Sequence, residues 1–357
     1  MVLFPINRKS YLVFAGIILL ALVSFCVDTT AKGKPMLSGF SMSPDGKTVA
    51  FNYCEGMSER CRLGLLNLAT ERIVYIPGTD GKFLAQPSFS SDGRRLAAIM
   101  GQPTSGQGSH VVVIDLATLE ITQLTEGRAN RGNPVFQPGT GKILYVEADA
   151  VGANLPWFNF RLHNISERTE TTILEVKDGF RVGIMRPSFL SPNEIVFGAY
   201  TPNEPGLSAA VKQLTGSIHT KIAFRLSFGG RPEIFLPHIE ARRKGYYEPG
   251  ISSISASKNG KDVVLVHLSL VEPRTKGVGY NYELFKLENG ELKALTNLKS
   301  ILLSAQVSLD GSTVAFGSDP KRRREWDLFV LDMKTGSVWE TRLLDRLAKH
   351  PDFAPSK

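Results

Sequence analysis

The residues of this chain best suited to acid–base or metal chemistry are six histidines, and they are scattered (110, 163, 219, 238, 267 and 350). A metal centre needs His, Cys or acidic ligands at short fixed spacing, which these positions do not show. Neither an H-E-x-x-H nor a G-x-S-x-G motif occurs, so the sequence signals no zinc peptidase and no hydrolase nucleophile. We therefore predict no metal, no cofactor and no catalytic residue.

One cluster carries a weaker indication of chemistry. His238 and Glu240 are followed closely by Arg242 and Arg243. A lyase could use such a His and Arg to neutralise a carboxylate and move a proton, although a solvated linker is the expected role. His267 lies in an apolar stretch, which favours a hydrogen-bonded core or channel residue over a catalytic base.

Candidate partner-binding residues are cationic or aromatic. A single basic run at 321–324 could hold an acidic protein surface, a phosphate group or an anionic glycan, and a solvated loop tip is the alternative. Trp157, Phe158 and Phe160 would suit a protein or sugar contact if exposed, whereas packing against a neighbouring sheet is the commoner role. The predicted partner-binding residues are Lys321, Arg322, Arg323, Arg324, Trp157, Arg242 and Arg243. The net charge of +8 is otherwise spread along the chain, so no nucleic-acid partner is expected.

The chain has only three cysteines, and their positions suggest an oxidising compartment. Cys26 belongs to an apolar N-terminal run. Cys54 and Cys61 are seven positions apart, a spacing that suits a bridge across a hairpin loop. We predict a structural disulfide between them, with two unpaired thiols as the alternative.

The first 35 residues read as a targeting segment. Arg8 and Lys9 precede an uncharged run at 11–27, which is intermediate in length between a signal-peptide core and a minimal membrane span. Small residues at 29–31 allow cleavage after Ala31, and an uncleaved anchor has the same topology. A lipoprotein anchored through Cys26 is disfavoured, because Phe25 stands where a small residue is expected. Each reading exports residue 36 onward.

Behind this segment lies an internal repeat in six copies, which decides the fold prediction. Each copy has an apolar stretch, a turn rich in Ser, Pro, Asp and Gly, and a strand of β-branched or aromatic residues. Asp-Gly and Asn-Gly favour tight hairpin turns because Gly tolerates positive φ at little cost. The turns lie at Asp45, Asp92, Gly139, Asn193, Asn259 and Asp310, spaced by 47, 47, 54, 66 and 51 residues.

Later in each copy a third and a fourth strand follow, and four strands make one propeller blade. The prediction is an all-β, six-bladed β-propeller over 36–345, preceded by a signal or anchor helix at 1–35 and followed by a tail at 346–357. The longer copies hold insertions near 201–219, 238–250 and 271–280, which usually share one face of a repeat fold. The sequence does not indicate how the ring is latched.

The turn Ser43-Pro44-Asp45-Gly46-Lys47, the strand Thr48-Val49-Ala50-Phe51, and later strands ending in Asp-Leu or Leu-Thr resemble the propeller repeats of the TolB family. The resemblance covers nearly all of 36–345. It implies a periplasmic protein that joins an envelope complex and contacts a peptidoglycan-associated lipoprotein. The separate α/β domain of that family is not expected, because the first repeat begins directly after the N-terminal segment.

From these features we predict an exported, monomeric, non-enzymatic interaction scaffold of the bacterial envelope. Its partner would be an envelope protein, for example a lipoprotein, or an anionic glycan. The N-terminal segment would contact the membrane, and the propeller would be periplasmic, either free after cleavage or anchored by residues 11–27. The alternatives are a propeller enzyme, namely a carbohydrate lyase or a lactone hydrolase, and an envelope glycan-binding module.

Overall fold

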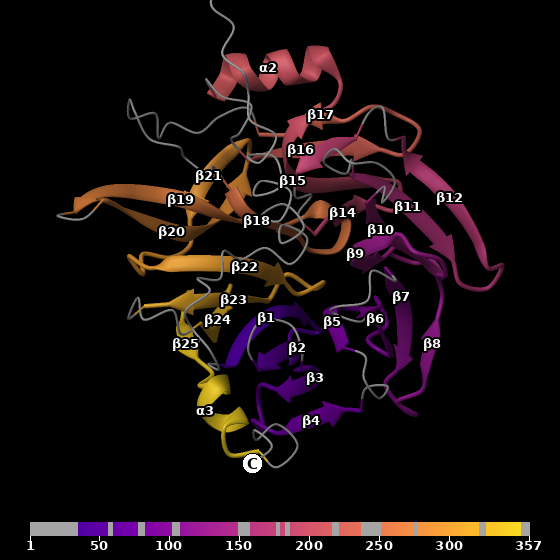
Figure 1. Cartoon of the computed structure of the whole chain (residues 1–357). Helices are drawn as coiled ribbons and strands as arrows, with labels where there is room; N and C mark the ends of the chain where they lie inside the picture. Colours follow the sequence, from indigo (N-terminus) through magenta and orange to yellow (C-terminus); the bar gives the residue numbers. More distant parts are fainter. Residues whose placement is uncertain are drawn as a thin grey trace, which may run out of the picture.

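The computed structural model describes residues 35–55, 60–77, 83–101, 108–148, 158–175, 179–182, 186–215, 221–236, 251–274, 277–320 and 326–350. Within these ranges six small antiparallel sheets surround one axis, as Figure 1 shows in a view along that axis. The chain is therefore a six-bladed β-propeller, as predicted. The predicted signal or anchor helix lies outside the described residues, and no described helix is long and apolar enough to span a membrane.

Each blade is a meander of four strands that runs from the axis outward, and three blades come from the first half of the chain. Blade 1 holds β1 (Pro35–Met42), β2 (Thr48–Glu55), β3 (Arg60–Asn67) and β4 (Ile73–Ile76). Blade 2 holds β5 (Phe83–Phe89), β6 (Arg95–Gly101), β7 (Ser109–Asp115) and β8 (Ile121–Gln123). Blade 3 holds β9 (Asn130–Phe136), β10 (Lys142–Ala148), β11 (Phe158–Asn164) and β12 (Thr169–Leu174).

The second half of the chain repeats this plan with two additions. Blade 4 holds β14 (Ser188–Ser191), β15 (Glu194–Pro202), β16 (Ile222–Ser227) and β17 (Glu233–Ile234). Blade 5 holds β18 (Ile251–Ala256), β19 (Val263–Arg274), β20 (Gly277–Glu288) and β21 (Glu291–Ala294). Blade 6 holds β22 (Ile301–Val307), β23 (Thr313–Asp319), β24 (Asp327–Asp332) and β25 (Val338–Glu340). A short strand, β13 (Phe180–Val182), pairs with both β11 and β15 and so joins blades 3 and 4.

The Ser-Pro-Asp-Gly turns form the hairpins that the sequence predicts. In blade 1 the Ser43 hydroxyl donates to the Asp45 carboxylate at 2.7 Å, and Gly46 adopts a φ of 68°. The turns of blades 2 and 6 repeat the Ser–Asp hydrogen bond, and their glycines also have positive φ. Since only a residue without a Cβ adopts this conformation at little cost, the turn chemistry fixes each inner hairpin locally.

Apolar side chains bind the blades to one another. On β2, Val49, Phe51 and Tyr53 pack toward blade 6, whereas Ala50 packs toward blade 2. This alternation follows from the two-residue period of a strand, which sends successive side chains to opposite faces. Because both faces of a blade are covered by neighbours, the central strands are almost entirely apolar and buried.

Serine hydroxyls link the inner strands around the axis. Ser188 accepts a hydrogen bond from the Ala256 amide at 2.8 Å, and Ser255 accepts one from the Val307 amide at 3.1 Å. Ser41 of β1 accepts a bond from β5 in the same way. These contacts satisfy strand edges that would otherwise be unpaired inside the ring.

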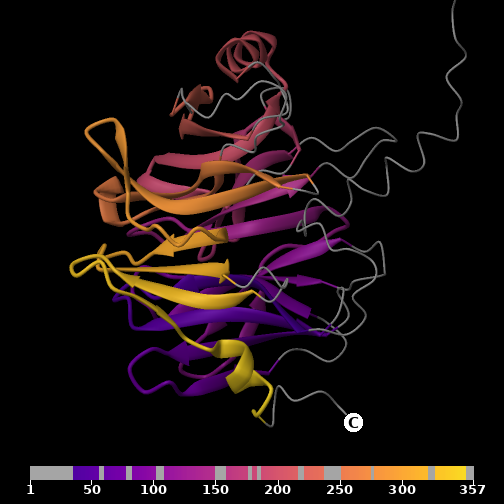
Figure 2. The ribbon, with the colours of Figure 1, turned by 90° about the vertical axis from the view of Figure 1, so that its left-hand side faces the viewer.

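Ring closure uses packing and a C-terminal helix instead of an exchanged strand. Among the described residues β1 pairs only within blade 1, and β22 to β25 pair only within blade 6. Helix α3 (Leu343–Leu347) lies over the seam between these blades, at the lower edge in Figures 1 and 2. Its Leu343 and Leu347 are fully buried in the cluster shared by blades 1 and 6. This helix straddles the predicted boundary between the propeller and the tail, at 345/346.

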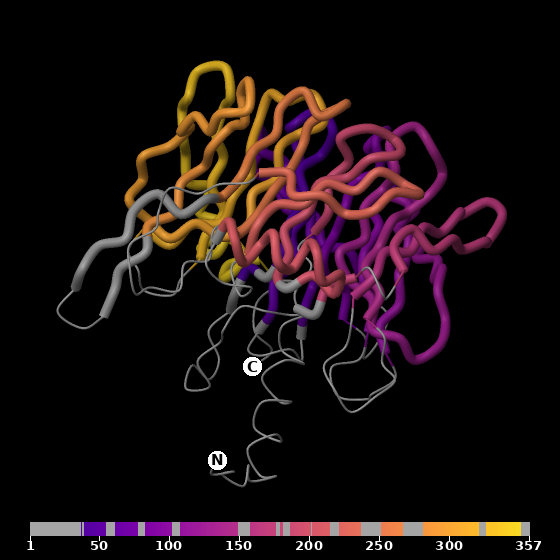
Figure 3. The backbone as a smooth tube through the Cα atoms, turned by 90° about the horizontal axis from the view of Figure 1, so that it is seen from above, coloured from indigo at the N-terminus to yellow at the C-terminus, as the bar shows by residue number. Residues whose placement is uncertain are grey.

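The insertions take forms that the sequence did not indicate. Helix α2 (Pro205–Thr215) fills the insertion of blade 4 and packs against β15 and β17, at the outer rim of the ring. The expected loop near 271–280 is instead a continuation of the β19–β20 hairpin, whose pairing extends to Arg274 and Gly277. Figure 3 views the ring from the side of blade 4, with blade 3 on one flank and blades 5 and 6 on the other.

Candidate functional site

All seven of the sequence-predicted partner-binding residues lie outside the described part of the chain. These are Trp157, Arg242, Arg243, Lys321, Arg322, Arg323 and Arg324. His238 and Glu240 also lie outside the described residues. His267 is placed only by its backbone, in β19 opposite Ile251. The roles suggested for all of these residues remain predictions.

The two aromatic residues that follow Trp157 are described, and they pack inside the propeller. Phe158 is 1% exposed and Phe160 is fully buried. The Phe160 ring meets the edge of Phe197 from blade 4, with centroids 4.9 Å apart. Packing against a neighbouring blade is therefore their role, and the alternative of an exposed aromatic contact is wrong for these two residues.

The predicted disulfide is present. Cys54 and Cys61 face each other across β2 and β3 and are bonded. Cys54 is buried, and Asn52 donates a hydrogen bond to its sulfur at 3.4 Å. The bridge closes the hairpin between the second and third strands of blade 1, at the end opposite the Asp-Gly turns.

A cavity of about 110 Å³ lies on the propeller axis. The ends of the inner strands and the turns that follow them line it, and all six blades contribute. Its walls combine serine hydroxyls, such as those of Ser41, Ser88 and Ser255, with apolar side chains such as Phe136 and Leu309. The cavity opens on the face that carries the Asp-Gly turns, which we call the turn face.

The half-buried side chain of Arg186 reaches toward the same axis. Its guanidinium donates to the Phe40 carbonyl at 2.8 Å, to the Gln86 carbonyl at 3.2 Å and to the Pro87 carbonyl. A residue of blade 4 therefore reaches across the centre to blades 1 and 2. Burial, which disfavours the charged form, lowers the pKa of Arg186 to about 10, so the group stays protonated at neutral pH.

Sequence reasoning missed Arg186, although the repeat contains a signal for it. Gln86, Asn133 and Arg186 each stand directly before the proline of an inner strand, at equivalent positions of blades 2, 3 and 4. Gln86 and Asn133 both adopt positive φ, and the Gln86 side chain accepts from the Asn133 amide at 2.6 Å. Polar residues in this X-Pro position of three blades therefore connect blades 1 to 4 near the axis.

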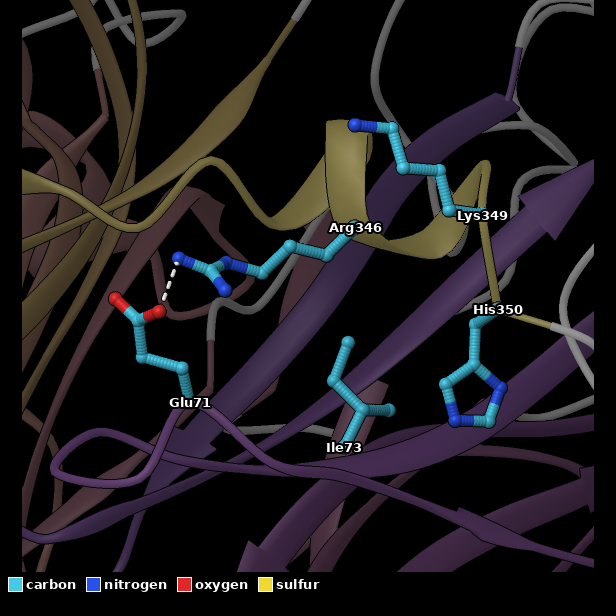
Figure 4. Close-up of a pocket in the computed structure, with 5 residues that line it drawn as sticks. All are labelled: Glu71, Ile73, Arg346, Lys349 and His350. Atoms are coloured by element: carbon cyan, nitrogen blue, oxygen red, sulfur yellow. Dashed lines mark ion pairs between the residues drawn. The ribbon is translucent and has the colours of Figure 1, made fainter.

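A second depression, of about 210 Å³, lies at the seam between the first and last blades (Figure 4). Arg346 of α3 forms an ion pair with Glu71 at 2.7 Å and donates to the Thr341 carbonyl at 2.9 Å. Ile73, Lys349 and His350 complete the lining. Because Arg346 already has these partners, we assign this depression to the latching of the ring.

A polar network crosses blade 3 on the side that faces blade 2. Glu147 pairs with Arg131 at 3.0 Å and with Arg161 at 3.2 Å. Tyr145 donates to Glu170, and burial together with this carboxylate raises the pKa of Tyr145. The charges are mutually compensated, so the network joins the strands of the blade. Within the described ranges, no group of three or more His, Cys, Asp or Glu side chains could hold a metal ion.

Comparison with known proteins supports the class that the fold defines. No protein-family model matches the chain. Its curated relatives include the Tol-Pal system protein TolB of Francisella tularensis, which is 19% identical in an alignment of 197 residues; the share of this chain that is covered is 41%. That alignment spans 45% of the relative, so less than half of its length is matched.

Solved structures give the same class. TolB from Acinetobacter baumannii superposes with a TM-score of 0.54 at 14% identity, over 94% of this chain and 70% of that one. An oligogalacturonate lyase in complex with manganese superposes with a TM-score of 0.51 at 16% identity. The match covers 87% of this chain and 85% of the lyase chain. The β-propeller domain of the trilobed protease from Pyrococcus furiosus, which has an open velcro topology, superposes with a TM-score of 0.51 at 12% identity. The match covers 86% of this chain and 97% of that domain. The chain is thus a TolB-like six-bladed propeller, and this architecture is shared by binding proteins and enzymes.

Proposed function

We propose that this protein is an exported scaffold of the bacterial cell envelope that binds a partner protein on one face of its propeller. The TolB relatives supply the class of function, since they are components of a Tol-Pal system. The Cys54–Cys61 disulfide supports an oxidising compartment such as the periplasm. The lipoprotein or other envelope protein that serves as partner would then meet the propeller outside the cytoplasm.

The observation that carries the proposal is the asymmetry between the two faces. The turn face consists of short hairpins, and the inner hairpins of blades 1, 2 and 6 are closed by Ser–Asp hydrogen bonds. The opposite face receives the connections between second and third strands and those between blades, and we call it the loop face. Such variable connections on a rigid scaffold commonly form binding surfaces.

Two described features show how the loop face is held. The disulfide closes one of its hairpins in blade 1. Arg131 donates to the Glu126 carbonyl at 2.8 Å and to the Ala129 carbonyl at 3.4 Å, so it anchors the connection from blade 2 to blade 3. A loop restrained before binding loses less conformational freedom when a partner docks.

Site-specific photocrosslinking tests the proposal. A photoreactive amino acid would replace Arg128 or Asn297, which are exposed on the loop face, or Thr118 or Lys334, which are exposed on the turn face as matched controls. Irradiation of cell envelopes should yield one dominant protein adduct from the loop-face positions and none from the controls. Equal labelling from both faces, or no adduct from any position, would refute the proposal.

A further inference from the structure

The axial cavity and Arg186 together form an arrangement that the scaffold role does not use. The residues that touch Arg186 are chain neighbours of the cavity wall, since Phe40 precedes Ser41 and Pro87 precedes Ser88. Pro187, the next residue after Arg186, lines the cavity itself. Arg186 is not itself one of the described residues that line the cavity, so its guanidinium lies beside the residues of the inner wall and outside the cavity.

The charge of Arg186 has no acidic partner among the described residues. Its hydrogen bonds go to three backbone carbonyls, and among the described residues no carboxylate forms an ion pair with it. Its Nε–H group likewise has no acceptor in the described part of the chain. Buried charges are ordinarily paired, because an isolated charge away from water is costly. A cation beside a cavity, without an acidic partner among the described residues, favours an anion there.

The wall of the cavity has the complementary chemistry. Among the described residues that line it there is no acidic side chain, and Lys258 is the one ionisable residue. Ser41 and Ser255 use their oxygens to accept backbone amides from the next blade, which leaves their hydroxyl hydrogens available to donate. Ser88 lines the cavity as well. The cavity thus offers hydroxyl donors from opposite sides of the axis.

The aspartates of the nearby turns are not part of the described cavity wall. Asp45, Asp92 and Asp310 each accept a hydrogen bond from the serine two residues earlier, within their own hairpin. Asp262 accepts from Ser257 and pairs with Lys286 at 2.8 Å. None of these four carboxylates belongs to the cavity lining.

The geometry points to an anion site on the turn face, in which the axial cavity binds a carboxylate group. A volume of about 110 Å³ holds three or four water-sized units, which suits a carboxylate with a short carbon stem. Arg186 supplies the charge, and the serine hydroxyls supply donors to the oxygens. The carboxylate belongs either to a small acid or to the end of a peptide chain.

This site is separate from the proposed partner surface. It opens on the turn face, whereas the partner is proposed to dock on the loop face. Failure of the crosslinking experiment would therefore leave the carboxylate site standing, and failure of carboxylate binding would leave the scaffold role standing.

The test uses NMR of the ¹⁵N-labelled protein, in which the Nε–H signal that disappears in Arg186→Lys is assigned to Arg186. Titration with sodium acetate at constant ionic strength should shift this signal with saturation, whereas acetamide, the neutral isostere, should not. N-acetylglycylglycine and its amide test whether the carboxylate is that of a peptide end. Tighter binding of N-acetylglycylglycine than of acetate assigns the site to a peptide end, and weaker binding assigns it to a small acid.

Variants give the decisive comparison. Binding of acetate, followed on backbone amides of the cavity wall, should weaken by about tenfold or more in Arg186→Met, because the positive charge beside the cavity wall is lost. It should weaken by about threefold in Ser88→Ala, where one hydroxyl donor is lost. Arg94→Met removes an exposed arginine of the turn face outside the cavity and should leave the affinity unchanged.

Two results would overturn the inference. One is acetate that moves no signal of the cavity wall in the wild-type protein, and the other is wild-type affinity in Arg186→Met. If Arg186→Met does not fold, Arg186→Lys and Ser88→Ala remain, and unchanged acetate affinity in both would count equally against the site.

Discussion

Removal of the Leu347 side chain should open the ring at its seam. Leu347 of α3 is fully buried between blades 1 and 6, which are not joined by an exchanged strand in the described residues. Leu347→Ala deletes three carbon atoms, worth about 2.4 kcal/mol at ~0.8 kcal/mol each. The cavity left behind raises the expected loss of unfolding free energy to about 3 kcal/mol.

The ion pair beside it should matter much less. Arg346 and Glu71 are 2.7 Å apart, but their side chains are 32% and 60% exposed. Exposed pairs contribute roughly 0.2–1 kcal/mol, so Arg346→Gln should cost less than about 1 kcal/mol. The latch is therefore expected to depend on apolar burial, with the ion pair orienting the helix.

Urea unfolding followed by tryptophan fluorescence measures these differences, and amide hydrogen exchange in β1 reports on the seam itself. Leu214→Ala on α2 is the matched control, because Leu214 is 40% exposed and should cost less than about 1 kcal/mol. In Leu347→Ala, exchange should accelerate in β1 more than in β14 of blade 4, which lies across the ring. A loss in Leu347→Ala no larger than in Leu214→Ala would refute the latch.

Three further predictions follow from individual residues. Gly46→Ala should destabilise the protein more than Gly139→Ala in urea unfolding. Both glycines have positive φ, but a Cβ at Gly46 would come within 2.7 Å of a blade 6 hydroxyl. At Gly139 no atom would lie within 4 Å of the added Cβ. Reduction of Cys54–Cys61 should cost about 2–3 kcal/mol, measured as the difference in urea unfolding with and without reductant; an unchanged midpoint would mean that the bridge adds no stability. Burial lowers the pKa of His163, so the unfolded chain binds its proton more readily and stability should fall as the pH drops below about 6.5. His163→Leu should reduce the difference between urea midpoints at pH 7.5 and pH 5.5, and an unchanged difference would assign the effect to other groups.

The binding site was less accessible to sequence reasoning than the fold. The predicted partner-binding residues were chosen because they are charged or aromatic, and such side chains have many roles. Phe160 illustrates the problem, since its burial depends on Phe197, which lies 37 positions later and in another blade. Arg186 had a local signal in the repeated X-Pro position, but the contacts of its guanidinium depend on the blades that face it across the axis.

The sequence by itself determined the number of blades, their order and the disulfide, because each depends on neighbours along the chain. A Ser-Pro-Asp-Gly turn closes its own hairpin, and Cys54 meets Cys61 within one hairpin. Only the tertiary structure decided how the ring is latched and what lies at its centre. The contacts of α3 with blade 1 and of Arg186 with Phe40 join residues far apart in sequence, and no local preference specifies which distant partner a side chain will meet.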